Sequence, residues 1–145
     1  MASLKTGHLP PPPLHPGFIG AGSTLLVAAF VTDVIYCQTS LMQWANFSTW
    51  LIAAGLVVAL GAALVLVIDF LIGRAGRILW ISFGAVAAAA LLSLLNVFVH
   101  TRDGWTSVVP QGIALSFIVT ILLLISAVRG WRVATARAAD MGDRA

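Results

Sequence analysis

Polar side chains that could form a small site gather near the ends of three apolar segments of this chain. Asp33 lies close to the end of the first segment, and Asn96 and His100 close the third. Arg102 and Gln111 flank the start of the fourth. At one depth in a membrane these groups can hydrogen-bond one another or a bound head group. We favour a structural set of interhelical hydrogen bonds; the alternative is a site for a quinone head group or a partner protein.

A second candidate group lies at the end of the second apolar segment. Asp69 is followed within eight residues by Arg74 and Arg77. An unpaired carboxylate in a membrane helix is costly, so we predict an interfacial ion pair of Asp69 with one of the two arginines. The alternative is a proton relay between Asp69 and Asp33. Such a relay needs polar residues between the two carboxyl groups, and the centres of the segments are apolar.

The histidines and the single cysteine do not indicate a metal or haem site. Two His at one depth on facing helices can ligate haem iron. However, His8 and His15 precede the first segment and His100 ends the third, so about 30 Å of hydrocarbon separates them. Cys37 alone excludes an internal disulfide and a cysteine-based zinc site. The chain also lacks phosphate-loop, nucleophile-elbow and dinucleotide motifs. We therefore expect no cofactor, no metal and no catalysis.

The composition predicts that lipid surrounds these groups. Of the 145 residues 60% are hydrophobic and 9% are charged, with no Glu and one Lys. A soluble domain carries about 25% charged residues on its surface. No basic stripe interleaved with aromatics is present, so nucleic acid is not an expected partner. The bilayer is.

Four apolar segments are each long enough to cross it, at about residues 18–37, 48–72, 78–99 and 110–130. A spanning helix needs about 17–25 residues, and helices alone satisfy their own backbone groups in lipid. The expected fold is all-α, an integral membrane four-helix bundle over residues 17–131. Residues 1–16 form a disordered Pro-rich tail and 132–145 a cytoplasmic tail. Residues 38–47 form the first loop, with Asn46, Ser48 or Thr49 capping the second helix.

The distribution of Arg predicts the orientation of the bundle. Positive charge gathers in the second connection and after the fourth segment, at Arg74, Arg77, Arg129, Arg132, Arg137 and Arg144. By the positive-inside rule both termini are cytoplasmic, and the protein is a multi-pass inner-membrane protein. Trp44 and Trp50 then mark one membrane interface, and Trp80 and Trp131 mark the other.

Small residues spaced by four predict which helix faces pack together. The rows are Gly20, Thr24 and Ala28; Gly55, Ala59 and Ala63; Gly84 and Ala88; Gly112, Ser116 and Thr120. Asn96 continues the third row, so we expect it to face inward. Asp33 lies five residues after Ala28, about 140° from that row at 3.6 residues per turn. It is therefore predicted to lie off the packed face, and its contact with Asn96 stays open.

Several stretches carry a resemblance to a known family. They are His15-Pro16, residues 32–36 (Thr-Asp-Val-Ile-Tyr), residues 48–56 (Ser-Thr-Trp-Leu-Ile-Ala-Ala-Gly-Leu), Ile68-Asp69-Phe70 with Arg74 and Arg77, and Leu94-Leu95-Asn96. From His15 to the end of the fourth segment the chain resembles a widespread bacterial family of small membrane proteins, catalogued as a domain of unknown function, number two-two-three-one. The resemblance implies the four-helix fold and an association with redox proteins such as cytochromes and dehydrogenases.

The chain also departs from the family pattern. The resemblance implies a His early in the third helix and an Asn one turn later, and at these positions the chain has Ser82 and Val86. Gly130-Trp131-Arg132 replaces a Gly-Gly-Glu stretch. These departures favour a non-catalytic inner-membrane subunit or anchor with a periplasmic or membrane redox protein as partner. The alternative is a small electron-transfer component that binds quinone or a haem shared with another subunit. Whether the chain forms an oligomer is left open.

Overall fold

Four helices make up the described part of the protein. The structure, a computed structural model, describes residues 14–73, 80–102 and 108–142, with side chains up to residue 130. The helices are α1 (His15–Thr39), α2 (Met42–Leu71), α3 (Trp80–His100) and α4 (Gln111–Gly142). Each is long and apolar enough to cross a membrane, α4 over Gln111–Gly130. The all-α four-helix prediction is confirmed.

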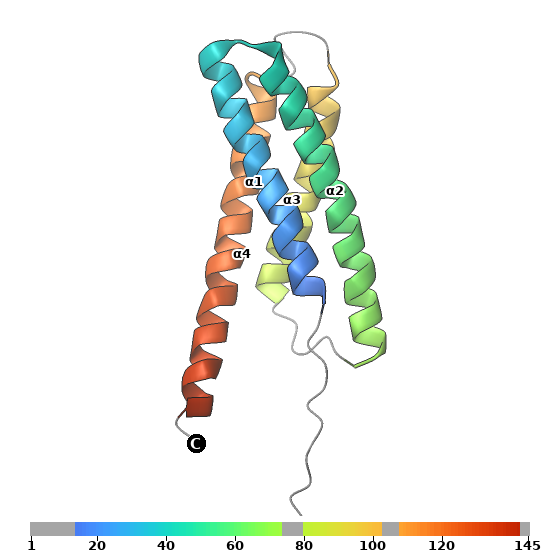
Figure 1. The fold of residues 1–145 in the computed structure, drawn as a ribbon, viewed down its shortest axis with the longest axis vertical. Helices are drawn as coiled ribbons and strands as arrows, with labels where there is room; N and C mark the ends of the chain where they lie inside the picture. Colours follow the sequence, from blue (N-terminus) through green and yellow to red (C-terminus); the bar gives the residue numbers. More distant parts are fainter. Residues whose placement is uncertain (1–13, 74–79, 103–107, 143–145) are drawn as a thin grey trace, which may run out of the picture.

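The helices run alternately up and down (Figure 1). The α1–α2 turn and the start of α4 lie at one end, which we call the hairpin end. The start of α1, the end of α2 and the end of α4 lie at the other, the termini end (Figure 1). The closest pairs are α1 with α2 and α3 with α4, and α1 with α4 and α2 with α3 join these pairs. Both ends of the helical domain therefore lie on the same side of the membrane.

The first hairpin is much tighter than the predicted loop over residues 38–47. α1 continues to Thr39, and Ser40 adopts a left-handed conformation (φ 54°, ψ 18°) that ends it. Its amide N–H donates to Tyr36 O at 2.7 Å. α2 begins directly after Leu41, without a side-chain cap, so the predicted caps are wrong. The first turn of α2 forms because its Ala45 packs against Tyr36 of α1, a contact that outweighs the local capping signal.

Two further helix boundaries differ from the predicted ones. α1 begins at His15, so the last residues of the predicted 1–16 tail are helical. Pro16 is tolerated there because amide N–H groups in the first turn of a helix have no acceptor within the helix, so the missing N–H of proline breaks no helical hydrogen bond. α4 continues to Gly142, so most of the predicted 132–145 tail is helical as well. Residues 1–13 and 143–145 lie outside the described residues.

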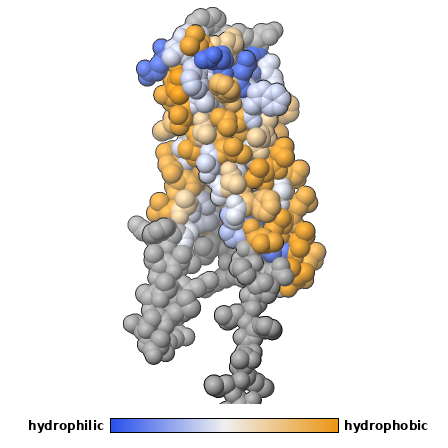
Figure 2. Space-filling view, viewed as in Figure 1, coloured by the Kyte–Doolittle hydropathy of each residue, from blue (hydrophilic) through white to orange (hydrophobic). Residues whose placement is uncertain are grey.

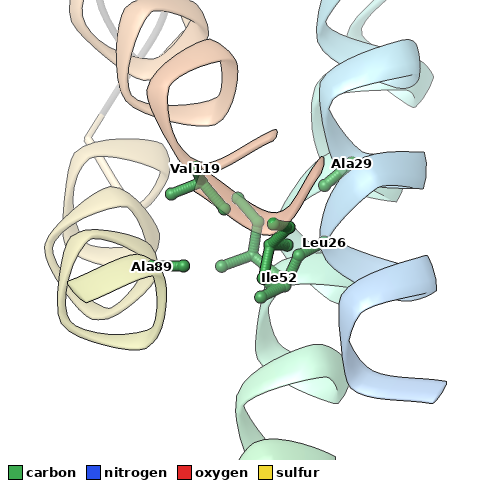
Figure 3. Packing of buried hydrophobic residues seen from close by; sticks show 6 residues of the cluster. Leu26, Ala29, Ile52, Ala89 and Val119 are labelled. Atoms are coloured by element: carbon green, nitrogen blue, oxygen red, sulfur yellow. The ribbon is translucent and has the colours of Figure 1, made fainter. Parts of the chain in front are cut away.

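The apolar core lies at the middle of the bundle and draws on all four helices. Leu26 and Ala29 of α1 meet Ile52 of α2, Ala89 of α3 and Val119 of α4 (Figure 3). Close approach of α1 and α2 is possible because Gly22 and Gly55 face each other. A Cβ atom at Gly55 would lie 2.8 Å from Leu26 Cδ2. Such backbone proximity is the usual source of helix association in lipid.

The observed packing faces correct the predicted small-residue rows on α1 and α3. On α1 the buried stripe contains Gly22, Leu26, Ala29 and Asp33, whereas Gly20 and Thr24 are exposed. On α3 it contains Ala89, Ser93, Asn96 and His100, and Gly84 is exposed. Of the α2 row, Gly55 is buried, Ala59 is half-buried and Ala63 is exposed, which corrects its last member. The row Gly112, Ser116 and Thr120 on α4 is buried as predicted. Lipid accepts small and large apolar residues alike, so the polar residues determine which face turns inward.

The outer surface suits a bilayer. Apolar residues cover the body of the bundle, and polar residues gather at the hairpin end (Figure 2). Trp50 on α2 and Trp80 at the start of α3 are 75% and 74% exposed. Exposed Trp side chains near the two ends of a spanning bundle match the aromatic belts of membrane interfaces. Residues 131–142 are described as backbone only, so the predicted interfacial role of Trp131 stays a prediction.

Candidate functional site: a buried polar layer

Five polar residues from all four helices meet at one depth near the hairpin end. They are Asp33 on α1, Ser48 on α2, Asn96 and His100 on α3, and Ser116 on α4, and we call them the polar layer. All five are buried, with Asp33 and Ser48 at 0% exposure. Asn96 and His100 share a face because they are four residues apart on one helix.

His100 is held through both ring nitrogens. Its Nε2 atom lies 3.0 Å from Asp33 Oδ1 and 3.2 Å from Ser48 Oγ. Its Nδ1 atom lies 3.0 Å from the backbone oxygen of Asn96, one turn earlier on α3. The Ser48 hydroxyl donates to Ala29 O at 3.3 Å. Through His100, α3 is therefore tied to α1 and α2.

Ser116 supplies the link to α4. Asn96 Nδ2 donates to Ser116 Oγ at 2.7 Å, and Ser116 Oγ donates to Asp33 Oδ2 at 2.5 Å. The contact between Asp33 and Asn96 that the sequence left open is thus made through a third residue. Asn96 Oδ1 is buried and has no hydrogen-bond partner in the structure.

The polar layer contains three of the five predicted cluster residues. Asp33 faces inward, contrary to the rotation expected from the small-residue row, and Asn96 faces inward as predicted. Arg102 and Gln111 are exposed and instead bond each other, Arg102 donating to Gln111 Oε1 at 2.9 Å. They bridge α3 and the start of α4 on the surface.

Sequence reasoning missed Ser48 and Ser116 as members of the layer. The sequence predicts Ser48 as a candidate helix cap before a long apolar run. It predicts Ser116 as a small packing residue. A hydroxyl within a spanning segment, at the depth of a carboxylate on another segment, was the available signal.

Apolar residues close the polar layer on both sides. Toward the hairpin end lies an apolar lid of Tyr36, Ala45 and Val108, which Trp44 and Ile113 pack against. Tyr36, Ala45 and Ile113 each lie three residues nearer that end than the layer residue on the same helix, about 4.5 Å at 1.5 Å per residue. Toward the middle lies the apolar core. The layer is therefore shielded from water and from lipid.

The residue types of a catalytic triad are present, but their arrangement is different. In a Ser-His-Asp triad the serine and the carboxylate bind opposite ring nitrogens, so that the carboxylate orients the base. Here Ser48 and Asp33 both meet His100 Nε2. The Ser48 hydroxyl is directed to a backbone oxygen and is fully buried. The geometry does not present a nucleophile to a substrate.

The second predicted group, around Asp69, has partners that the sequence did not indicate. Asp69 Oδ2 accepts from His15 Nδ1 at 2.8 Å and from the backbone N–H groups of Leu14 and His15 at 2.9 and 3.1 Å. The carboxylate of α2 thus caps the positive end of the α1 dipole. Arg74 and Arg77 lie outside the described residues, so the predicted ion pair stays a prediction.

Two shallow apolar grooves lie on the flanks of the bundle. One, of about 200 Å³, is lined by Leu66, Val67, Phe70, Trp80 and Phe83 of α2 and α3. The other, of about 220 Å³, lies between α1 and α4 and includes Thr24 and Leu123. In the described residues no group of three or more His, Cys, Asp or Glu could hold a metal ion.

Comparisons with other proteins give one match. Residues 11–141 match the family described as "Predicted membrane protein (DUF2231)". No curated protein and no solved structure matches the chain.

Proposed function

The chain belongs to the DUF2231 family of predicted membrane proteins, and on that premise we propose that it is a non-catalytic subunit or anchor in the inner membrane. Its partner in this proposal is a redox protein, a dehydrogenase or a cytochrome of the membrane or periplasm. The redox character of the partner rests on the family resemblance. The anchoring role rests on how the buried polar groups are used.

The main support for this proposal is the closure of the polar layer. Asp33, His100 and Ser116 are the groups best suited to bind a substrate or a cofactor head group, and each is bound to another side chain of the layer. A site for a soluble substrate would keep at least one of them open to solvent. Groups that are bonded within the protein in this way fix the positions of the helices, which is what an anchor requires.

The outer surface of the bundle is compatible with docking within the membrane. Large apolar side chains project from α2 and α3 at the termini end, including Phe70 and Trp80 beside the groove of about 200 Å³. Lipid or a partner helix can cover such a face equally well, since both are apolar. The proposal needs no chemistry from these residues.

An absorption spectrum of the native protein tests the proposal against its alternative. We expect the full chain, purified from its own membranes in mild detergent, to migrate with a flavin- or haem-containing partner at fixed stoichiometry, and to be colourless once it is separated from that partner. Reduced-minus-oxidised spectra of the separated chain measure this directly. A Soret band that stays with the separated chain, or stoichiometric quinone in its organic extract, would instead identify a small electron-transfer component.

The partner complex itself provides the second readout. Substituting Trp80 and Phe70 by Ala removes apolar area from the groove at the termini end, whereas Leu91→Ala removes it from an exposed site elsewhere on α3. If the groove is the docking face, the first pair of changes releases the partner and Leu91→Ala does not. Equal retention by all variants would exclude that face.

A further inference from the structure

We propose that Asp33 and His100 form a buried binding site for a single exchangeable proton, held between His100 Nε2 and Asp33 Oδ1. This inference concerns the polar layer alone and does not depend on the proposed docking role. It follows from counting the hydrogens that the surrounding groups supply. The two atoms are 3.0 Å apart, and both side chains are shielded from solvent.

The hydrogen on the other ring nitrogen is already assigned. His100 Nδ1 faces the backbone oxygen of Asn96 at 3.0 Å. A carbonyl oxygen can only accept, so Nδ1 carries a hydrogen. Any proton on Nε2 is therefore the second one of the ring, and its presence makes the ring an imidazolium.

The neighbouring groups leave the Nε2–Oδ1 contact without any other hydrogen. Asn96 Nδ2 can only donate, so Ser116 accepts from it and directs its own hydrogen to Asp33 Oδ2. Ser48 Oγ lies 3.2 Å from Nε2, but its hydroxyl donates to Ala29 O and so adds no hydrogen there. Without a shared proton, lone pairs of Nε2 and Oδ1 would face each other at 3.0 Å. The geometry thus points to one proton, on either atom.

One proton also gives the polar layer a net charge of zero. Removing it leaves a buried carboxylate, and adding another leaves a buried imidazolium, and each single charge is costly in this environment. Among the described residues packed around the pair, α2 presents Ser48 and α4 presents Ser116, which do not titrate. On α1, Tyr36 lies one turn beyond Asp33 and Cys37 is exposed. Arg102 at the end of α3 is exposed and bound to Gln111.

The route by which this proton exchanges runs through the apolar lid. Tyr36, Ala45 and Val108 separate the layer from the hairpin end by one helical turn. On the other side, the apolar core lies between the layer and the termini end. Displacing the lid is the shorter way to admit water, so the proton comes from the aqueous phase at the hairpin end.

The count of protons is measured on the unmodified full chain in nanodiscs. Nitrogen-15 spectra of labelled His report whether each ring nitrogen carries a hydrogen, with His8→Gln and His15→Gln used only to assign the signals. Infrared difference spectra against Asp33→Asn report whether the Asp33 carboxyl is protonated. Imidazolium with carboxylate, or neutral imidazole with carboxylic acid, gives a count of one and supports the proposal. Neutral imidazole with carboxylate, or imidazolium with carboxylic acid, overturns it.

Two matched valine variants test the route. Val108→Ala opens the lid, and Val119→Ala removes the same two methyl groups from the core beneath the layer. Exchange of the His100 ring hydrogens with deuterated solvent should become several-fold faster in Val108→Ala and change little in Val119→Ala. Faster exchange in Val119→Ala alone, or no change in Val108→Ala, would overturn access from the hairpin end.

Discussion

Ser116 is the residue through which α4 joins the polar layer. Its hydroxyl accepts from Asn96 and donates to Asp33, so it satisfies one atom on each of two other helices. Removing one member of a buried network leaves its partners unsatisfied, which costs more than the bond itself contributed. Removing a single hydroxyl group from this layer should therefore lower the free energy of unfolding by more than the small size of the group suggests.

Substitution of Ser116 by Ala tests this directly. We expect a loss of about 1–3 kcal/mol in the free energy of unfolding, because a buried amide and a buried carboxylate each lose a partner. Titration of the protein in mixed micelles with a denaturing detergent measures it. Thr120→Val, one turn along the same helix, removes a buried hydroxyl that bonds only its own helix at Ser116 O. Equal losses in the two variants would contradict an interhelical role for Ser116.

Asp69 gives a second residue-scale prediction. Asp69→Asn keeps the shape of the side chain but removes the charge that strengthens its bonds to His15 and Leu14, which are stronger to an ionised acceptor. We expect the amides of Leu14 and His15 to exchange faster with deuterated water, because the first turn of α1 frays. Hydrogen exchange read by mass spectrometry measures this. Asp33→Asn, at the other end of the bundle, should leave these amides unchanged, and unchanged exchange in Asp69→Asn would show that another group caps α1.

At the scale of the helices, the close approach of α1 and α2 depends on one position. Gly55 faces Gly22 and the side chain of Leu26, and a Cβ atom there would lie 2.9 Å from Leu26 Cγ. Gly61, on the same helix, has more space, since its nearest neighbour would be Phe18 Cδ1 at 3.8 Å. The close contact between α1 and α2 therefore depends on the absence of a side chain at Gly55 and not at Gly61.

Alanine at these two positions should act in opposite directions. Gly55→Ala forces Leu26 aside in a packed core, so we expect a loss of about 1–3 kcal/mol in stability. Gly61→Ala meets ordinary contacts and gains helix propensity, worth up to about 1 kcal/mol. Detergent titration of both variants measures the difference. Adding Leu26→Ala should recover part of the loss in Gly55→Ala; a neutral Gly55→Ala would show that the helices can separate at this point.

The helices themselves are predictable from the sequence, and their rotations are predictable only in part. Apolar runs of sufficient length determine that a segment spans a bilayer. They say little about which face packs, because lipid and core are both apolar, and the small residues Gly20 and Thr24 turned out to face outward. On α3, Asn96 and His100 share the inward face. Their spacing of four residues predicts that they share one face of the helix. The start of α2 was missed because it depends on Ala45 meeting Tyr36, a contact between segments.

At the scale of the whole molecule, the orientation in the membrane is the next property to measure. The start of α1, the end of α2 and the end of α4 lie at one end of the bundle (Figure 1). The Arg distribution predicts that this side is cytoplasmic. The hairpin end, with the lid over the polar layer, would then face the periplasm.

Reporter fusions after Gly73, after Asp103 and at Ala145 test this orientation. A reporter active only in the periplasm should work after Asp103 and fail at the other two positions. A fluorescent reporter that matures only in the cytoplasm should give the reverse pattern and serves as the control. Periplasmic activity at Ala145 would overturn the predicted topology and place the lid on the cytoplasmic side.

The polar layer also constrains how the protein can be made. Asp33 and Ser48 emerge from the ribosome with the first hairpin, but His100 and Ser116, their partners, follow with the second. Until then Asp33 and Ser48 have no partner from the second hairpin. The first hairpin carries only part of the polar layer, and alone in lipid it would expose the Asp33 carboxyl group without His100 or Ser116. The polar layer is complete only when both hairpins are present.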